Sequence, residues 1–319
     1  MTPLVSIIMP VYNGEMYLPM ALDSVGRQDG IDELEIIAMD DGSTDRSMEL
    51  LHRYAARLPI VIAPIERTGN WVANTNRGIA MARGRYVCFL HQDDLWRDGR
   101  LTWIREATRR HPECSVLFSA ADFLSPDHRT VGRWTAPFSQ RGEQVLKPME
   151  WFCPMLVQNY LAIPAPVIRR DSLTPLDERL PYAADWKCWL SLARQHTALY
   201  EPHATVGFRV HAESQTCSMT SDPEAYRLQL QSVLREFESF APDTRDGRRW
   251  RAAAELGLVA NAMMAAAYHH RPAPWRIFGS ALWNAGIRGT TRYVTASRLI
   301  ERLSARISVL RQTAPTPRR

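Results

Sequence analysis

The chain has 319 residues, of which 45% are apolar and 23% charged, and a formal net charge of +5. These values are ordinary for a globular protein, and they exclude a disordered chain, a collagen-like repeat and a small disulfide scaffold. The charge is unevenly placed, because residues 247–319 hold 13 arginines against two glutamates, a net charge of +11, while residues 1–246 carry −6. We expect the basic part to face an anionic partner, with an arginine-rich codon habit as the alternative.

Cysteine usage and hydropathy predict a cytoplasmic protein. The five cysteines are widely spaced and form no Cys-x-x-Cys pair, which is typical of reduced, buried thiols. No apolar stretch reaches the roughly 20 residues that span a bilayer, and the first ten residues lack the basic start of a signal peptide. Contact with a membrane is therefore expected only at its inner face, as a peripheral attachment.

Residues 4–120 alternate between short apolar runs and helical patterns. The predicted strands are 4–9, 34–39, 60–63, 86–90 and 115–120. Helices are predicted between them, with apolar residues at 18, 22 and 25 and at 50, 51, 54 and 58 in the first two, and over 71–82 and 99–110 in the others. This order predicts an α/β fold with a mostly parallel, Rossmann-like sheet flanked by helices on both faces.

The alternation is lost in the next hundred residues. The turn-rich segment 122–148 predicts an excursion over the sheet, followed by a helical piece over 149–160. A proline-interrupted strand over 163–168 is suited only to a sheet edge. A helix over 184–194 and a short last strand over 206–210 complete this part.

Beyond residue 221 the sequence predicts helices alone. Their expected ranges are 222–240, 249–270, 274–287 and 294–312. We therefore predict two parts, a ligand-binding and catalytic domain over 1–220 and an α-helical C-terminal region over 221–319.

Acidic residues follow two of the predicted strands directly. Asp40 and Asp41 end the second strand, and Asp93 and Asp94 come just after the fourth. Since parallel sheets bind ligands at the carboxyl ends of their strands, we expect the two pairs to meet at one edge, unless they serve only as turn formers and helix caps. Both common glycine-rich phosphate loops are absent from the sequence, so a diphosphate held here needs a divalent cation, for which Mg²⁺ or Mn²⁺ suits oxygen ligands.

Five segments, in order, resemble the motifs of family 2 glycosyltransferases. Residues 5–14 (VSIIMPVYNG) and 39–45 (MDDGSTD) resemble the opening of that family. Residues 76–94, which end in HQDD, resemble its approach to the D-x-D segment. Residues 184–186 (ADW) and 209–214 (RVHAES) resemble its later motifs. The resemblance implies a GT-A type fold and an inverting sugar transfer from a nucleotide diphosphate sugar, aided by Mn²⁺ or Mg²⁺.

The resemblance also implies roles for individual residues. Asp185 is the expected general base, Asp93 and His211 are expected metal ligands, and Trp186 is predicted as a platform for the acceptor. The implied nucleotide-binding residues are Pro10, Tyr12, Glu15, Asp40, Asp41 and Gln92. Contacts to the donor sugar or its diphosphate are expected from His91, Asp94, Arg209 and Ser214.

The chemistry gives these residue types a reason. An aspartate has a reference pKa of about 3.9, so it is ionised at neutral pH and can take a proton from an attacking sugar hydroxyl. A base on one face and a metal-bound diphosphate on the other predict in-line displacement, hence inversion. Three positions depart from the family pattern: His91 replaces the first D-x-D carboxylate, Ala184 the acidic residue before the base, and Ser191 an arginine of the following helix.

We therefore predict a transferase that moves a sugar from a UDP- or dTDP-sugar to a glycan or lipid-linked acceptor in cell-surface polysaccharide synthesis. A pyrimidine is favoured because an aspartate at the base-contact position can accept from its imide N–H. A non-catalytic GT-A-like protein that binds a glycan or a partner is the alternative that His91 and Ala184 favour. A sugar nucleotidyltransferase remains a further alternative, although it should open with a glycine-rich loop. Nucleic acid is not an expected partner.

The last predicted helix, 294–312, is amphipathic. Its apolar face consists of Leu299, Leu303, Ile307 and Leu310, and arginines flank that face. This basic C-terminal helix is expected to pack on the catalytic domain with its arginines in solvent, or to touch an anionic membrane peripherally. Packing against a second subunit in a homodimer is a further alternative.

Overall fold

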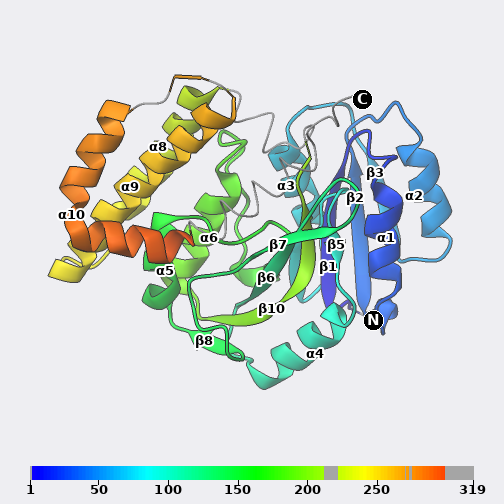
Figure 1. Cartoon of the computed structure of the whole chain (residues 1–319). Coiled ribbons are helices and arrows are strands. Elements are labelled where there is room, and N and C mark those ends of the chain that lie inside the picture. Colours follow the sequence, from blue (N-terminus) through cyan, green and yellow to red (C-terminus); the bar gives the residue numbers. More distant parts are fainter. Residues whose placement is uncertain (1, 212–221, 270, 273–274, 299–319) are drawn as a thin grey trace, which may run out of the picture.

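The computed structural model describes residues 2–211, 222–269, 271–272 and 275–298 (Figure 1). The strands are β1 Val5–Val11, β2 Leu34–Asp40, β3 Ile60–Pro64, β4 Tyr86–Phe89, β5 Leu95–Trp96, β6 Val116–Leu124, β7 Thr130–Trp134, β8 Gln144–Leu146, β9 Val167–Arg169 and β10 Ala198–Arg209. The α-helices are α1 Leu18–Gly26, α2 Ser47–Ala55, α3 Trp71–Met81, α4 Arg100–Arg110, α5 Pro148–Val157, α6 Ala184–Gln195, α8 Pro223–Phe237, α9 Arg245–Tyr268 and α10 Trp275–Ser297. The predicted α/β class is confirmed.

The sheet has two differently built halves. Its strand order is β3-β2-β1-β4-β9-β6-β10-β5, with β7 added to β6 and β8 to β10. Strands β3, β2, β1 and β4 are parallel, as the βα alternation predicts. The other half is mixed, so that within the described residues four strand pairings are parallel and five are antiparallel.

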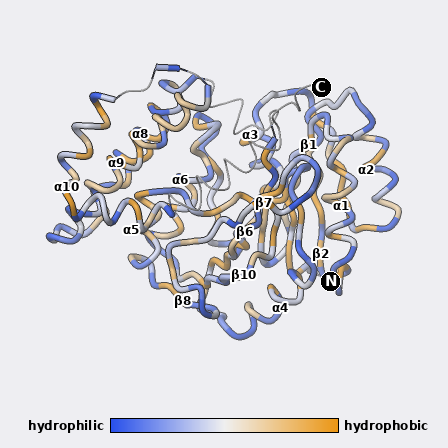
Figure 2. Tube along the Cα trace, viewed as in Figure 1, coloured by the Kyte–Doolittle hydropathy of each residue, from blue (hydrophilic) through white to orange (hydrophobic). Residues whose placement is uncertain are grey.

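Helices cover both faces of the parallel half because successive strand residues point to opposite sides. Ile7 and Met9 of β1 pack in one core with α1, α2 and α4. Ile8, between them, packs in the other core with α3, α5 and α6. Figure 2 shows the result, with apolar residues concentrated along the central strands and mixed hydropathy along α1 and α2.

The segment predicted as an edge strand corrects the sequence analysis. Strand β9 lies inside the sheet, where it pairs antiparallel with β4 on one side and β6 on the other. The prolines at 164 and 166 precede the strand, so they remove no N–H from its ladder. The excursion over 122–148 also contributes strands, β7 and β8, and the last strand is longer than expected because β10 pairs with β6 from residue 198 to 209.

Helices α8, α9 and α10 gather beside α5 and α6, away from α1 and α2 (Figure 1). They share a core with α5, in which Phe237 of α8 packs against Phe152. Gly257 lets α9 approach α5 closely, because a Cβ there would lie 2.4 Å from the main-chain oxygen of Val157. Helix α10 bends at Gly286, whose φ of 59° is in the left-handed region.

None of the helices that the structure describes has the length and apolarity to traverse a lipid bilayer. The predicted amphipathic helix over 294–312 falls largely outside the described residues, as do all four of its apolar positions, Leu299, Leu303, Ile307 and Leu310.

Candidate active site

The two predicted acidic pairs lie at one edge of the sheet. Strands β2 and β4 flank β1 in parallel, so their carboxyl ends point the same way. The N–H of Asp41 donates to the carbonyl of Val11, the last residue of β1, at 2.8 Å. Asp40, Asp41 and Asp94 are all buried. The strand order also reverses here, between β1 and β4, and such a switch point is the usual ligand position in these sheets.

Asp41 holds the loop that precedes α3. Its carboxylate accepts hydrogen bonds from the N–H of Thr68 at 2.6 Å, the Thr68 hydroxyl at 3.1 Å and the N–H of Gly69 at 2.9 Å. Burial raises the pKa of Asp41, but these hydrogen bonds outweigh it and the pKa is lowered. Asp40 accepts from the N–H of Ser43 through Oδ2, while its buried Oδ1 has no partner among the described residues.

The other predicted nucleotide-binding residues surround the loop after β1. The amide of Gln92 accepts from the N–H of Tyr12 at 2.8 Å and donates to its carbonyl at 2.9 Å. The exposed Tyr12 ring carries the guanidinium of Arg67, whose Cζ lies 3.6 Å from the ring centroid. Glu15 points instead to Arg46, at 3.2 Å. Pro10, half-buried near the end of β1, completes the set. Gln92 and Glu15 therefore shape the loop, and Tyr12 offers the exposed surface.

The turn after β4 gathers the predicted metal ligands. One ligand atom each from His91, Asp93 and Asp94 lies within 4.8 Å of the other two. His211 Nε2 lies 2.9 Å from Asp93 Oδ2, so the predicted pair is in contact. Burial raises the pKa of Asp93, but the hydrogen bond with His211 and the charges of both histidines lower it overall. Burial and the neighbouring Asp93 raise the pKa of Asp94.

Arg209, which is predicted to contact the diphosphate, holds this turn in place. Its N–H donates to Asp94 Oδ1, its Nε to the carbonyl of Asp93 at 2.8 Å, and its Nη1 to the carbonyl of Ser125 at 2.8 Å. The residue is 2% exposed and therefore offers almost no surface to a ligand. Ser214, predicted beside it, lies outside the described residues.

Asp185 lies in the first turn of α6, in a different electrostatic setting. Its Oδ1 accepts from the N–H of Trp186 at 2.7 Å and its Oδ2 from the Asn159 amide at 2.9 Å. Burial raises the pKa of Asp185 to about 6, although these hydrogen bonds oppose the shift. At pH 7 the group is thus mostly ionised, but it binds a proton far more readily than an ordinary aspartate.

Helix α3 connects the two acidic sites. The Trp71 indole donates to the carbonyl of Pro181 at 2.7 Å, and its ring packs edge-on against His91 with 5.4 Å between centroids. Asn76, one and a half turns later, exchanges two hydrogen bonds with the main chain of Leu176, at 2.8 and 2.9 Å. The segment that leads into α6 is therefore tied to the helix that begins beside Asp41.

Comparison with known proteins shows which protein family this domain resembles. Residues 6–156 match the family model described as glycosyl transferase family 2. These residues are a family 2 glycosyltransferase domain. "Uncharacterized glycosyltransferase EpsJ" of Bacillus subtilis is 40% identical over 94 residues, which are 30% of this chain and 27% of EpsJ. "Minor teichoic acid biosynthesis protein GgaB" of the same organism is 36% identical over 96 residues, 30% of this chain and 11% of that protein.

A solved structure confirms the fold of the family 2 domain. Residues 1–349 of S. aureus TarS, in complex with UDP-GlcNAc, superpose with a TM-score of 0.58 at 17% identity, covering 93% of this chain and 91% of that one. The GT-A type fold with C-terminal helices is therefore confirmed. The chain spans about a quarter of the length of EpsJ and about a tenth of that of GgaB, so these likenesses concern the domain.

The donor atoms of the family 2 domain fit a divalent cation. His91 Nε2 and Asp94 Oδ2 are buried and have no hydrogen-bond partner among the described residues. Unpaired buried polar atoms are costly, and an imidazole nitrogen beside carboxylate oxygens is a ligand set that Mn²⁺ accepts. His91, which departs from the usual D-x-D, is therefore compatible with metal binding.

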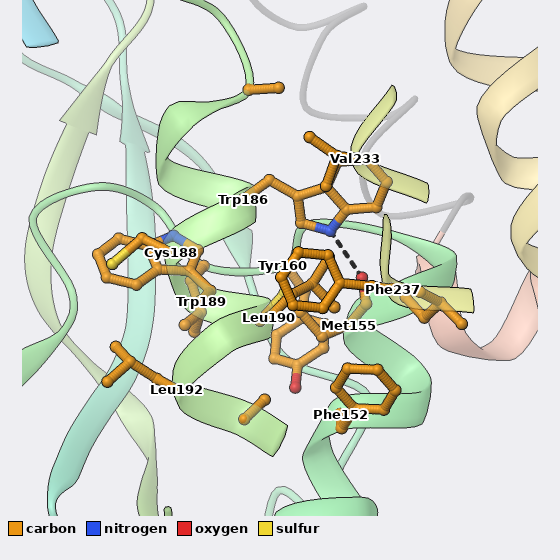
Figure 3. Close-up of a cluster of buried hydrophobic side chains, with 14 of the residues drawn as sticks. Phe152, Met155, Tyr160, Trp186, Cys188, Trp189, Leu190, Leu192, Val233 and Phe237 are labelled. Carbon is orange, nitrogen blue, oxygen red and sulfur yellow. Dashed lines mark hydrogen bonds between the residues drawn. The ribbon is translucent and has the colours of Figure 1, made fainter. Parts of the chain in front are cut away.

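Trp186, the predicted acceptor platform, faces the core of the protein. Trp186 is 5% exposed and its indole donates to the carbonyl of Met155 at 2.8 Å, so it lies in the core with Val233 and Phe237 (Figure 3). Adjacent residues on a helix face about 100° apart, so a residue next to the base need not face the site. Sequence reasoning also missed Arg67, Trp71 and Asn159, whose importance rests on contacts with residues far along the chain.

Proposed function

We propose that this domain is an inverting glycosyltransferase in which Asp185 takes the proton of the acceptor hydroxyl. The observation that carries the proposal is the carboxylate itself, which is half-buried, held by N–H groups, and has a pKa raised to about 6. General bases work best when their pKa lies close to the working pH, because they are then both ionised and basic. Attack by the deprotonated oxygen, opposite the leaving diphosphate, inverts the sugar.

For the donor, we propose a UDP- or dTDP-sugar. Asp41 lies at the switch in strand order, and the exposed Tyr12 ring lies across the β1 end with Arg67 on its face. The Asp41 carboxylate already accepts from the N–H groups of Thr68 and Gly69, and we propose that it likewise accepts from a pyrimidine imide N–H. TarS, similar in fold, was crystallised with UDP-GlcNAc, which supports a uridine donor.

The leaving group would be served by the turn after β4. Asp93, His211, His91 and Asp94 would hold Mn²⁺ or Mg²⁺. When bound, such a cation neutralises the charge that develops on the departing diphosphate. Arg209 supports the metal-binding residues by holding Asp93 and Asp94 in place through hydrogen bonds.

A surface polysaccharide or lipid-linked glycan is the proposed acceptor, and the name of the GgaB relative, a teichoic acid biosynthesis protein, supports this. We also propose the division into parts 1–220 and 221–319, joined by a shared core between α5, α8 and α9. Neither proposal is needed for the chemistry at Asp185.

The direct test is thermal unfolding with UDP, dTDP, GDP and their sugars, each with and without Mn²⁺. A ligand at 100 times its Kd adds about 2.7 kcal/mol of stability, a shift that is readily measured. A Mn²⁺-dependent shift with UDP or dTDP supports the proposal. No shift with any nucleotide would favour the alternative, a non-catalytic protein that binds a glycan or partner.

A peripheral contact with anionic lipid is a second proposal, supported by α10. Six large apolar side chains of this helix are exposed: Trp275, Ile277, Leu282, Trp283, Ile287 and Val294. Trp283 and Ile287, at 87% and 88% exposure, lie on either side of the bend at Gly286. Residues 271–298 contain five arginines and no acidic residue, and the segment after them is also basic. If a second copy of this chain or the basic segment after residue 298 covered this face of α10, arginines would lie next to arginines and repel one another. Anionic lipid instead carries the opposite charge and would attract them.

Vesicle sedimentation tests this contact. We expect binding to phosphatidylserine-containing vesicles but not to pure phosphatidylcholine, and its loss in the double variant Trp283→Ser, Ile287→Ser. Leu228→Ser removes an exposed apolar side chain, at 51% exposure, from α8 and is the control. Concentration-dependent dimerisation that the double variant abolishes, without vesicle binding, would identify a homodimer surface instead.

A further inference from the structure

A line of hydrogen bonds runs from α9 to Asp185 by way of three amide residues, and it passes through the main chain of the third. The Asn261 amide of α9 donates to Gln158 Oε1 at 2.8 Å. Gln158 Nε2 donates to the carbonyl of Asn159 at 3.1 Å. The side chain of Asn159 then donates to Asp185 Oδ2 at 2.9 Å. Asn261 and Gln158 are each 8% exposed, so this line is buried where it leaves the helical part.

The contacts of Asn159 determine which end of its amide faces the carboxylate. Its Oδ1 accepts from the N–H of Leu161 at 3.1 Å, so the amide nitrogen is the end that remains for Asp185. Gln158 is oriented in the same way, since its oxygen meets the Asn261 nitrogen and its nitrogen meets a carbonyl. Asn261 therefore restricts the Gln158 side chain, Gln158 restricts the main chain of Asn159, and the Asn159 side chain restricts the carboxylate.

Helix α9 is seated at the start of this line. Gly257 lies one turn before Asn261, and its missing Cβ allows the main chain of α9 to meet the carbonyl of Val157, the residue just before Gln158. A close backbone approach of this kind restricts how far α9 can shift or rotate on α5. The position of Asn261 relative to Gln158 is thus set by the packing of two helices.

We propose that Asn261, Gln158 and Asn159 are positioning residues that hold the Asp185 carboxylate, so that the helical part of the chain orients the base of the catalytic domain. This inference rests on the proposed role of Asp185. The three residues act through one another, and only Asn159 contacts the carboxylate.

Amides suit this task because they orient a carboxylate without fixing its charge. A cation in place of Asn159 would stabilise the ionised form and lower the pKa of Asp185. The nearby cation Lys187 lies against Asp177 and Glu236, at 3.1 and 2.6 Å. Cys188, on the same helix, is neutral because burial raises the pKa of its thiol to about 12. In the described part of the chain, N–H donors alone hold the Asp185 carboxylate.

The test follows the Asp185 carboxyl group by ¹³C NMR titration of the whole chain labelled at aspartate, with Asp185→Asn to assign its signal. Asn159→Ala should raise the titration midpoint by about one pH unit, because a hydrogen bond to the charged form is lost. Asn261→Leu should raise it by a smaller amount, because its effect passes through two amides. Asn284→Leu, on the exposed side of α10, is the control and should leave the midpoint unchanged.

A second variant covers the case in which Asn159→Ala does not fold. Asn261→Asp keeps the shape of the side chain but removes its donor to Gln158, and it should shift the midpoint in the same direction. Folded Asn159→Ala and Asn261 variants with a wild-type midpoint would overturn the inference.

Release of UDP from UDP-GlcNAc with Mn²⁺ separates this inference from the proposed function. If Asp185→Asn turns over as fast as the wild type while the midpoint shifts occur, the base is wrongly assigned but the amide line stands. If Asp185→Asn loses turnover and no midpoint shifts, the base is supported and the amide line is rejected.

Discussion

The turn after β4 and the start of α6 both present aspartates, but in opposite electrostatic settings. Asp93 lies against His211, and the two nearby histidines lower its pKa despite burial. Asp185 lies among N–H donors, and burial raises its pKa to about 6. The first setting keeps a carboxylate ionised, which suits a cation, whereas the second lets it exchange a proton near neutrality. The two aspartates therefore differ in chemistry through their neighbours alone.

The largest effect is expected from removal of the carboxylate at the start of α6. Asp185→Asn should lower turnover by about 10²- to 10⁴-fold, the usual contribution of a general base, while donor affinity stays within twofold. Steady-state release of nucleotide and isothermal titration with the donor measure the two quantities. Asp171→Asn, an exposed aspartate, is the control. Equal losses of turnover and of donor affinity would contradict a base and indicate a binding role.

The next largest effect is expected from removal of a charged side chain from the turn after β4. Asp93→Asn removes a charged ligand from the turn, so Mn²⁺-dependent affinity for UDP should fall by about 10- to 100-fold. Titration with UDP at several Mn²⁺ concentrations measures it, and chelation of the metal should give the same affinity in wild type and variant. Asp98→Asn, an exposed neighbour, should bind as the wild type does. An unchanged Mn²⁺ dependence would remove Asp93 from the metal site.

The pH profile sharpens the comparison. With a pKa raised to about 6, Asp185 becomes protonated as the pH falls through that value, so kcat/KM should drop about tenfold per pH unit below it. An aspartate in the setting of Asp93, whose pKa is lowered, would place this acid limb at a distinctly lower pH. Initial rates between pH 4 and 8 distinguish the two, and the residual rate of Asp185→Asn should lack the limb.

The smallest effect concerns the neighbour of the base. Trp186→Phe removes a hydrogen bond to Met155 and part of a buried ring, which should cost about 1–3 kcal/mol of stability. Donor affinity and the pH midpoint should stay unchanged, because the indole faces the core. Denaturant unfolding measures the stability. Titration with the donor measures the affinity, and the pH profile of the rate gives the midpoint. A selective rise in the KM for the acceptor, without lost stability, would restore the platform role.

Local patterns were sufficient for the parallel half of the structure. The apolar runs at 4–9, 34–39, 60–63 and 86–90 became β1 to β4, and the two acid pairs met at one edge, because strand period and the direction of βα units dictate both. The prediction that 163–168 forms an edge strand was wrong because strand pairing depends on the tertiary structure. A short apolar segment does not reveal which strands it will pair with, and β9 pairs with two strands that are distant in sequence.

The sequence by itself thus determined the fold class, the family resemblance and which strand ends carry acid. Only the tertiary structure decided what those residues face. Arg209 and Trp186 turned inward, and Asp185 met an amide line that begins at Asn261, 76 positions further along the chain. The reason is physical: periodicity reports which residues are buried, while pKa and orientation depend on the few atoms in contact, which long-range packing brings together.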